Sequence, residues 1–478
     1  MSYRSKLSTD IIVSTAATLS IRLRGLIFIP LISGGLSVTA FGAYTQVLAV
    51  ARLLEVLAGV RLYDVLVRYG QERDQDASEL FYTLFTVVVV SSAFVAAFMF
   101  SIAQLLSQYT LSTGEYAAAY QAGAVLVLLR AVFRIQVSYF KMNGRIKFYS
   151  IIETANTYAI VSGVAAAILI FSSDLAGVFD AIILGDALTV VLLQGLIVRE
   201  IGVATPSFER IGEYLRYSVP LTTSTLASTV SSRVDRFLIG AFLGAQAVGV
   251  YSIAYQIATA IMIYVKPIRI TFFPEFSQLL ENGKLDRCSR YLRQGVRYFL
   301  LISLPTVGGM YLIGPDVIGI IAGEGANPSG ILVATIALGV VGLGVDNIYW
   351  VVLTADKRTL RATIIRWVGA VANLGLSIPL VLEFGIIGAA VATLGTYALT
   401  AGLMYYSSGK VFETTFVTGT LIRTALATVA MVVLTGLVTN SLVYSVVVGA
   451  LSYGVVVLAL GEFSRAELRQ IQSSLPML

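Results

Sequence analysis

The sequence predicts an all-α protein that crosses a membrane many times, and three observations support this prediction. Hydrophobic residues make up 57% of the 478 residues and charged residues only 13%, whereas a typical soluble domain carries about 25% charged residues. Apolar segments of about 20 residues, the length that crosses the hydrocarbon core of a bilayer, recur along the whole chain. The lysines and arginines between these segments are confined to alternate loops. We therefore predict fourteen transmembrane helices.

The predicted helices follow one another with short connections. They cover residues 11–33, 39–66, 80–106, 116–140, 149–171, 178–198, 218–241, 246–272, 298–320, 330–354, 362–381, 386–408, 415–437 and 441–461. The first of them contains Arg22 and Arg24 and has no small-residue cleavage site before a polar mature region, so we do not interpret it as a cleaved signal peptide.

Positive charge identifies one side of the membrane. Seven alternate loops contain no Lys or Arg, and they lie around 34–38, 107–115, 172–177, 242–245, 321–329, 382–385 and 438–440. The remaining loops and both ends of the chain contain Lys or Arg, most densely at 284–297. The positive-inside rule then predicts a multi-pass protein of the cell membrane with both termini in the cytoplasm. The net charge of +6 is explained by this topology and gives no support for binding nucleic acid.

The composition excludes several kinds of chemistry. The chain has no histidine, and its single cysteine is Cys288. An intrachain disulfide, a cysteine-based zinc site and a histidine-dependent catalytic triad are therefore excluded, and we predict no metal site and no cofactor. The phosphate-binding pattern G-x-x-x-x-G-K-[ST] is also absent, which excludes an ATP-driven transporter within this chain.

A short motif occurs twice at the same place in two sets of six helices. Leu36–Tyr44 follows the first predicted helix and Leu243–Tyr251 follows the seventh, with Leu, Ala, Gly and Tyr in matching positions. Both sets begin on the cytoplasmic side, which predicts parallel repeats forming two lobes around a central cavity; chance similarity between apolar helices is the alternative. We predict an N-terminal lobe at 1–199, a cytoplasmic linker at 200–217, a C-terminal lobe at 218–408, and two extra helices with a cytoplasmic tail at 409–478.

These motifs also carry a family resemblance. The segments Leu36–Tyr44, Gly59–Tyr69 and Ser231–Gly244, the last running into Gly249–Tyr251, resemble the polysaccharide transporter family of the multidrug/oligosaccharidyl-lipid/polysaccharide exporter superfamily. The resemblance implies a MATE-like fold and a non-enzymatic flippase. Such a protein would move a polyprenyl- or dolichyl-(pyro)phosphate-linked oligosaccharide to the outer leaflet by alternating access, for surface polysaccharide or glycoprotein glycan synthesis.

The same resemblance implies the partners. They would be the lipid-linked oligosaccharide, membrane lipids, and glycosyltransferases, a polymerase or an oligosaccharyltransferase of the same pathway, with the chain itself a monomer. For the energy source, the sequence leaves three alternatives open: a Na⁺ gradient, a H⁺ gradient and the membrane potential. A cation-coupled multidrug exporter of the same fold is the alternative function. A membrane glycosyltransferase or polymerase is a weaker alternative, because no sizeable external loop is predicted.

Ionisable residues inside the predicted helices point to an anion-binding cavity. The cations are Arg22, Arg24, Arg52, Arg61, Arg130, Arg134, Arg233, Arg236, Lys266, Arg269, Arg366 and Arg423. The acids are Glu55, Asp64, Glu153, Asp180, Asp186, Asp235 and Asp346. Each charge in the bilayer centre costs roughly 2.5–3.5 kcal/mol, and the cations outnumber the acids. The excess predicts a water-filled cavity that attracts anions.

Eight cations are our candidates for that cavity, on predicted helices 1, 2, 4, 7 and 8: Arg24, Arg22, Arg61, Arg233, Arg236, Lys266, Arg130 and Arg134. Arg22 and Arg24 are about 200° apart around a helix, so only one can face the cavity squarely, and we favour Arg24. Arg130 and Arg134 have no acid nearby in sequence and require an anionic partner from elsewhere.

Local ion pairing is the alternative explanation for several of these residues. Arg52 with Glu55, and Arg61 with Asp64, are three residues apart and can form bridges within one helix. Arg366, near a helix end, can extend its side chain to the membrane surface.

Three carboxylates are candidates for binding a coupling cation: Asp346, Asp64 and Asp235. Asp346 lies in the middle of the tenth predicted helix without a local partner, and a buried bridge to an arginine is its alternative role. Asp235 lies between Arg233 and Arg236, where it can hold one arginine and leave the other for a ligand. A purely structural triad is the alternative there.

Overall fold

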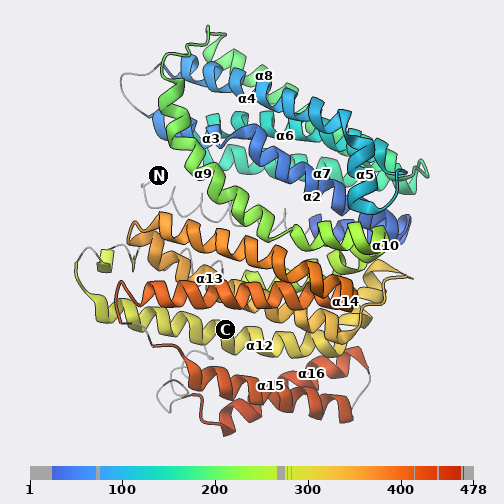
Figure 1. Ribbon diagram of the computed structural model, residues 1–478, viewed down its shortest axis with the longest axis vertical. Coiled ribbons are helices and arrows are strands. Elements are labelled where there is room, and N and C mark those ends of the chain that lie inside the picture. Colours follow the sequence, from blue (N-terminus) through green and yellow to red (C-terminus); the bar gives the residue numbers. More distant parts are fainter. Residues whose placement is uncertain are drawn as a thin grey trace. The chain divides into compact units, whose positions relative to one another are not determined.

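The computed structural model describes residues 24–71, 76–265, 275–276, 278–280, 282–323, 325–413, 415–438, 441–463 and 467. Nearly all of these residues are helical (Figure 1). Eleven helices among them are long and apolar enough to cross a membrane, which confirms the all-α membrane class. The number fourteen stays a prediction, because most of the first expected helix lies outside the described residues.

The packing divides the chain into two compact units. One comprises Met1–Ile253 with Ile321–Ala326, and the other comprises Ala254–Ile320 with Asn327–Leu478. The expected lobe boundaries stay a prediction.

The first unit contains a short helical segment ending in η1 and nine α-helices, the last of which continues into the second unit. They are η1 (Ile29–Gly34), α2 (Val38–Gly59), α3 (Leu62–Tyr69), α4 (Ala77–Ser101), α5 (Ala103–Leu111), α6 (Ala117–Met142), α7 (Ile146–Leu169), α8 (Leu175–Ile201), α9 (Ile211–Ser231) and α10 (Val234–Ala258). Helix α6 packs against α2, α3, α4, α5, α7 and α8. Its buried side chains, such as Ile135 and Phe140, join the apolar core formed with α3, α4 and α8.

The second unit continues the chain with longer helices. They are η2 (Thr259–Ile263), α12 (Leu285–Ala322), α13 (Gly330–Ala355), α14 (Thr359–Ser408), α15 (Thr418–Val438) and α16 (Leu442–Ala459). Helix α13 packs along α14, and α15 packs along α16 (Figure 1).

Glycines in a left-handed conformation break two of these helices. Gly244 in α10 has φ 81° and Gly385 in α14 has φ 61°, values that side chains of L-residues rarely adopt. Each break joins two helical segments. The positions agree with the loops expected at 242–245 and 382–385.

Three expected helices are interrupted although the sequence predicted each as continuous. The helix expected at 80–106 is divided at Ile102, between α4 and α5. The helix expected at 39–66 ends at Gly59 and restarts at Leu62. The helix expected at 218–241 is divided by a turn at Ser232 and Arg233. The residues before this turn include Thr225, Ser228 and Thr229, whose hydroxyls donate to main-chain carbonyls three or four residues earlier. Such bonds weaken and bend helices.

The two repeat motifs cross one another at a pair of glycines. A Cβ atom on Gly42 would lie 1.8 Å from the carbonyl oxygen of Ala245, and one on Gly249 would lie 2.2 Å from that of Val38. Gly249 and Ala245 are the positions 207 residues after Gly42 and Val38. Each motif therefore makes the same contact with the other, and the crossing is symmetric. Thr45 Oγ1 and Ser252 Oγ, also separated by 207 residues, are 3.3 Å apart. We name this contact of α2 with α10 the glycine crossing.

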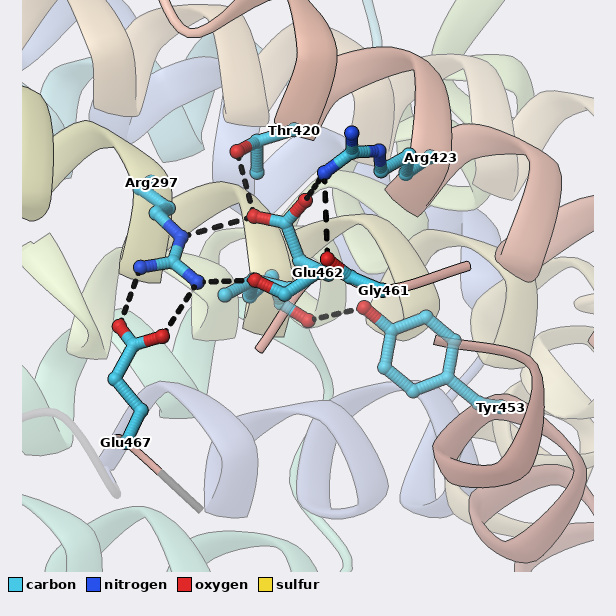
Figure 2. A network of polar contacts seen from close by, with 8 residues as sticks. Arg297, Thr420, Arg423, Tyr453, Gly461, Glu462 and Glu467 are labelled. Atoms are coloured by element: carbon cyan, nitrogen blue, oxygen red, sulfur yellow. Dashed lines mark hydrogen bonds and ion pairs between the residues drawn. The ribbon is translucent and has the colours of Figure 1, made fainter. Parts of the chain in front are cut away.

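A polar cluster attaches α15 and α16 to α12 (Figure 2). The carboxylate of Glu462, which follows α16, accepts hydrogen bonds from Arg297 of α12 at 2.9 Å, Thr420 of α15 at 2.6 Å and Arg423 of α15 at 3.4 Å. Tyr453 of α16 donates to the carbonyl oxygen of Leu301 at 2.7 Å. The two C-terminal helices are therefore held by a common buried carboxylate.

Candidate functional site

Arg61 lies at the break between α2 and α3. Val60 and Arg61 have φ values of 40° and 50°, a conformation that is strained for a β-branched residue such as valine. The hydroxyl of Ser91 donates to the carbonyl oxygen of Ala58 at 2.6 Å, which satisfies one main-chain group that the break releases. The break brings Arg61 to the start of α3, inside the helix that the sequence analysis expected to be continuous.

The side chain of Arg61 contacts its own helix and α9. Its Nε atom donates to Asp64 Oδ2 at 2.5 Å, and its Nη1 atom donates to Thr225 Oγ1 at 2.6 Å. The guanidinium also lies over the ring of Tyr63, 5.5 Å from the centroid. The expected bridge between Arg61 and Asp64 is therefore present, and Asp64 is engaged with an arginine.

Glu55 of α2 holds two arginines. Arg52 Nη1 donates to Glu55 Oε2 at 2.8 Å, and Arg134 of α6 forms an ion pair with Oε1. Arg134 also lies over Tyr63, 5.9 Å from its centroid, so that ring contacts both Arg61 and Arg134. Tyr63 therefore links Arg61, at the start of α3, to Arg134 of α6.

Asp186 of α8 is the partner of Arg130. Arg130 Nε is 3.3 Å from Asp186 Oδ2, and Asn156 Nδ2 of α7 donates to Oδ1 at 3.0 Å. Thr189 Oγ1 donates to Asn156 Oδ1 at 2.9 Å. Arg130 and Arg134 were predicted to need anionic partners from elsewhere in the chain. These partners are Asp186 of α8 for Arg130 and Glu55 of α2 for Arg134. We call the set Arg52, Glu55, Arg61, Asp64, Arg130, Arg134 and Asp186 the arginine network.

Asp235 and Arg236, at the start of α10, contact residues of α10. Asp235 is buried and accepts hydrogen bonds from Tyr251 at 2.6 Å and from the main-chain N–H of Arg236 at 2.8 Å. The guanidinium of Arg236 donates to Ser252 at 3.2 Å, next to the glycine crossing. Arg233 occupies the turn between α9 and α10.

Arg24 lies over the ring of Phe28, with its guanidinium carbon 4.9 Å from the centroid. Arg22 and Lys266 lie outside the described residues.

Asp346, in the second unit, contacts an arginine. Arg366 Nη2 of α14 is 3.5 Å from Asp346 Oδ2, and the same guanidinium lies over Trp350 at 5.8 Å. The buried bridge, given as the alternative for Asp346, is thus present. We predicted that Arg366 can extend its side chain to the membrane surface. That prediction did not include these contacts with α13. In the described part of the chain, no group of three or more Cys, Asp or Glu side chains could hold a metal ion.

The sequence analysis did not select Glu55, Asp186 or Asn156 as site residues. Glu55 was interpreted only as the local partner of Arg52. Asp186 contacts Arg130 across 56 residues of sequence and Asn156 across 30 residues, and no spacing pattern predicts contacts over such distances. One signal in the sequence was available. Arg130 and Arg134 have no acid nearby in sequence, which indicates that acids from other helices belong to the site.

Solved structures with the same fold are membrane transporters. The lipid II flippase MurJ in an inward closed conformation matches with a TM-score of 0.77 at 14% identity, over 93% of this chain and 98% of that one. An inward-facing multidrug resistance MATE family transporter matches with a TM-score of 0.67 at 14% identity, over 84% of this chain and 97% of that one. These likenesses confirm the MATE-like fold.

Similar sequences occur in Haloferax volcanii. The protein named probable flippase AglR is 25% identical over 458 residues, which are 92% of each chain. The protein named probable low-salt glycan biosynthesis flippase Agl15 is 26% identical over 281 residues, 58% of each chain. The family described as polysaccharide biosynthesis protein matches residues 36–329. Because this match covers more than half of the sequence, the chain belongs to the polysaccharide biosynthesis protein family.

Proposed function

We propose that this protein is a flippase that moves a lipid-linked oligosaccharide from the cytoplasmic to the outer leaflet. It is a transporter of the MATE-like fold and not an enzyme. The observation that carries the proposal is the arginine network, in which arginine side chains of helices expected in the membrane are 24–38% exposed. Exposed charge facing lipid chains is costly, so these groups fit a water-filled path for an anion.

A phosphate or pyrophosphate group matches the chemistry of this site. Guanidinium groups bind phosphate oxygens with charge-assisted, often bidentate hydrogen bonds. The names of the Haloferax relatives, which refer to flippases and to glycan biosynthesis, support an oligosaccharide carried on a polyprenyl or dolichyl (pyro)phosphate. A MATE-type multidrug exporter has less support, because a guanidinium-rich path repels the cationic drugs such proteins export.

The remaining features of the proposal concern orientation, energy and partners. Both termini lie in the cytoplasm, the chain acts as a monomer in the cell membrane, and enzymes of the same glycan pathway supply and use its substrate. A Na⁺ or H⁺ gradient drives alternating access, with Asp346, Asp64 and Asp235 as the candidate cation sites. The bridges of Asp346 to Arg366 and of Asp64 to Arg61 would have to open for a cation to bind there.

Arg134→Ala tests the proposed function. A hydrogen bond to a charged group contributes about 1.5–3 kcal/mol, so the loss of this arginine should weaken substrate binding roughly tenfold or more. We expect loss of glycan display at the surface and accumulation of the lipid-linked intermediate in the cytoplasmic leaflet. Arg24→Ala and Arg233→Ala should act in the same direction. Arg134→Lys should be partly active, because it keeps the charge but loses the planar fork.

Membrane abundance must be measured in parallel, because Arg134 also pairs with Glu55. Arg199→Ala removes an exposed arginine near the end of α8 and is the matched control. If the Arg134, Arg24 and Arg233 variants were all abundant and all displayed glycan at the wild-type level, the anion path would be the wrong interpretation.

The orientation can be tested by labelling single cysteines in intact cells. In a Cys288→Ser background, Glu115→Cys and Asn327→Cys should react with a membrane-impermeant maleimide, because both exposed residues lie in loops without Lys or Arg. Arg290→Cys, exposed near the start of α12, should react only after the membrane is permeabilised. The reverse pattern would contradict cytoplasmic termini.

A further inference from the structure

Two of the three acids of the arginine network, Glu55 and Asp186, are more deeply buried than the arginines that they hold. The side chains of Arg52 and Arg134 are 33% and 38% exposed, whereas the Glu55 side chain that they share is 4% exposed. Arg130 and Asp186 repeat the arrangement at 24% and 6%. The arginine side chains are therefore partly accessible, and these two carboxylates are covered.

Glu55 differs from the other acids of the network in the number of cations around it. Each of its two oxygens contacts a different arginine, Arg52 through Oε2 and Arg134 through Oε1. Arg130 is a third cation that interacts electrostatically with this carboxylate. Asp64 is 30% exposed and pairs with Arg61 of its own helix, and Asp186 is also held by Asn156. Glu55 is thus the carboxylate placed to compete with a ligand for two guanidiniums at once.

A guanidinium has five N–H donors, and each arginine uses part of that set on Glu55. A phosphate that approaches the exposed side meets cations that are already partly neutralised. It also meets the negative charge of Glu55 a few ångströms behind them, which opposes tight binding. A transport site must bind its substrate firmly enough to load and weakly enough to release it, as is established for ion conduction. A covered carboxylate behind the arginines provides that balance.

We propose that Glu55 is an internal counter-ion to the substrate phosphate. It positions Arg52 and Arg134 while the site is empty, and it gives up part of its contact with them when the anionic head group binds. Glu55 is therefore a positioning residue that limits affinity and permits release. This inference rests on the proposed function, since it requires an anionic substrate at these arginines.

The test measures binding and transport separately in Glu55→Gln, which keeps the size and the hydrogen-bonding oxygen but removes the charge. Farnesyl pyrophosphate is the probe, titrated calorimetrically into the purified full-length chain in detergent. We expect about tenfold tighter binding, the effect of removing one like charge near the phosphate in a medium of intermediate dielectric. Glycan display in cells should fall at the same time, because release is slowed. If Glu55 had only a structural role, its replacement by Gln would not raise the affinity for the probe while it lowers transport.

Two further variants control this measurement. Asp180→Asn removes a negative charge from an exposed position on α8 that is not part of the arginine network, and it should leave the dissociation constant unchanged. If Glu55→Gln accumulates poorly, Glu55→Gln with Arg52→Gln removes one charge of each sign and keeps Arg134. That double variant should bind the probe within about threefold of wild type, because the two charge changes oppose each other.

The outcomes separate this inference from the proposed function. If Arg134→Gln weakens probe binding and Glu55→Gln does not tighten it, the anion site stands and the counter-ion role of Glu55 is wrong. If neither the wild-type chain nor Glu55→Gln binds the probe, or Arg134→Gln binds it as well as wild type, the anion site itself is wrong and both conclusions fall.

Discussion

Replacing Gly42 with alanine is expected to destabilise the protein and to stop transport, although it adds only one methyl group. The new Cβ would lie 1.8 Å from the carbonyl oxygen of Ala245 and 2.8 Å from the nitrogen of Gly249. Both atoms belong to the main chain, so the clash cannot be relieved by a side-chain rotation. The helices α2 and α10 would have to separate, and the contact between Thr45 and Ser252 would open.

Overpacking of a well-packed core typically costs about 1–3 kcal/mol, and a main-chain clash of this kind lies at or above the upper end of that range. The midpoint of thermal unfolding in detergent and glycan display in cells are the two measurements. Because Gly249 occupies the equivalent position in the second repeat motif, Gly249→Ala should have the same effect. Its Cβ would meet the carbonyl oxygen of Val38 at 2.2 Å.

A glycine in open space provides the control for these variants. A Cβ on Gly195 of α8 would meet nothing within 4 Å, and alanine favours a helix over glycine by about 1 kcal/mol. Gly195→Ala should therefore be as stable as the wild type or more so. A Gly42→Ala protein with an unchanged midpoint and normal glycan display would contradict the close approach of the two repeats.

The repeat was visible in the sequence because its matching residues, such as Gly42 and Gly249, are conspicuous in otherwise apolar helices. The structure adds that these two copies touch one another, which similarity alone does not reveal. Ion pairs within one helix, such as Arg52 with Glu55, followed from a spacing of three residues. The helix breaks at Gly244 and Gly385 were likewise predictable, since glycines occupied the loops free of positive charge.

Contacts between distant helices were beyond what spacing can predict. Arg134 and Glu55 are separated by 79 residues, and their pairing depends on how α2 packs against α6. The breaks at Val60 and at Ser232 were not predicted, because charged residues beside them, such as Arg61 and Arg233, were interpreted as side chains within a continuous membrane helix. At the first break the tertiary environment contributes a hydrogen bond from Ser91 to the carbonyl oxygen of Ala58.

Glu462→Gln should loosen the attachment of α15 and α16 to α12. The Glu462 side chain is 3% exposed and contacts Arg297, Thr420 and Arg423 (Figure 2). Removing one partner of a buried ion pair costs about 3–5 kcal/mol. The loss should be somewhat smaller here, because Arg297 also pairs with Glu467 at 2.6 Å. We expect a lower midpoint of thermal unfolding at pH 7. Glu413→Gln, at an exposed position in the same unit, should have no such effect.

The pH dependence of this difference identifies the charge of Glu462 as its cause. Burial raises the pKa of Glu462, but the hydrogen bond from Thr420 and the guanidiniums of Arg297 and Arg423 outweigh it and hold the pKa below the usual value of 4.5. A carboxylate whose pKa is lowered in the folded state contributes stability that is complete above its unfolded pKa and is lost as the pH falls through its folded pKa. The midpoints of wild type and Glu462→Gln should therefore differ by a constant amount from pH 7 to about pH 5.5, and should converge as the pH falls below 4.5. A difference that stayed constant down to pH 3, or a Glu462→Gln midpoint equal to that of Glu413→Gln at pH 7, would show that the carboxylate charge does not hold these helices.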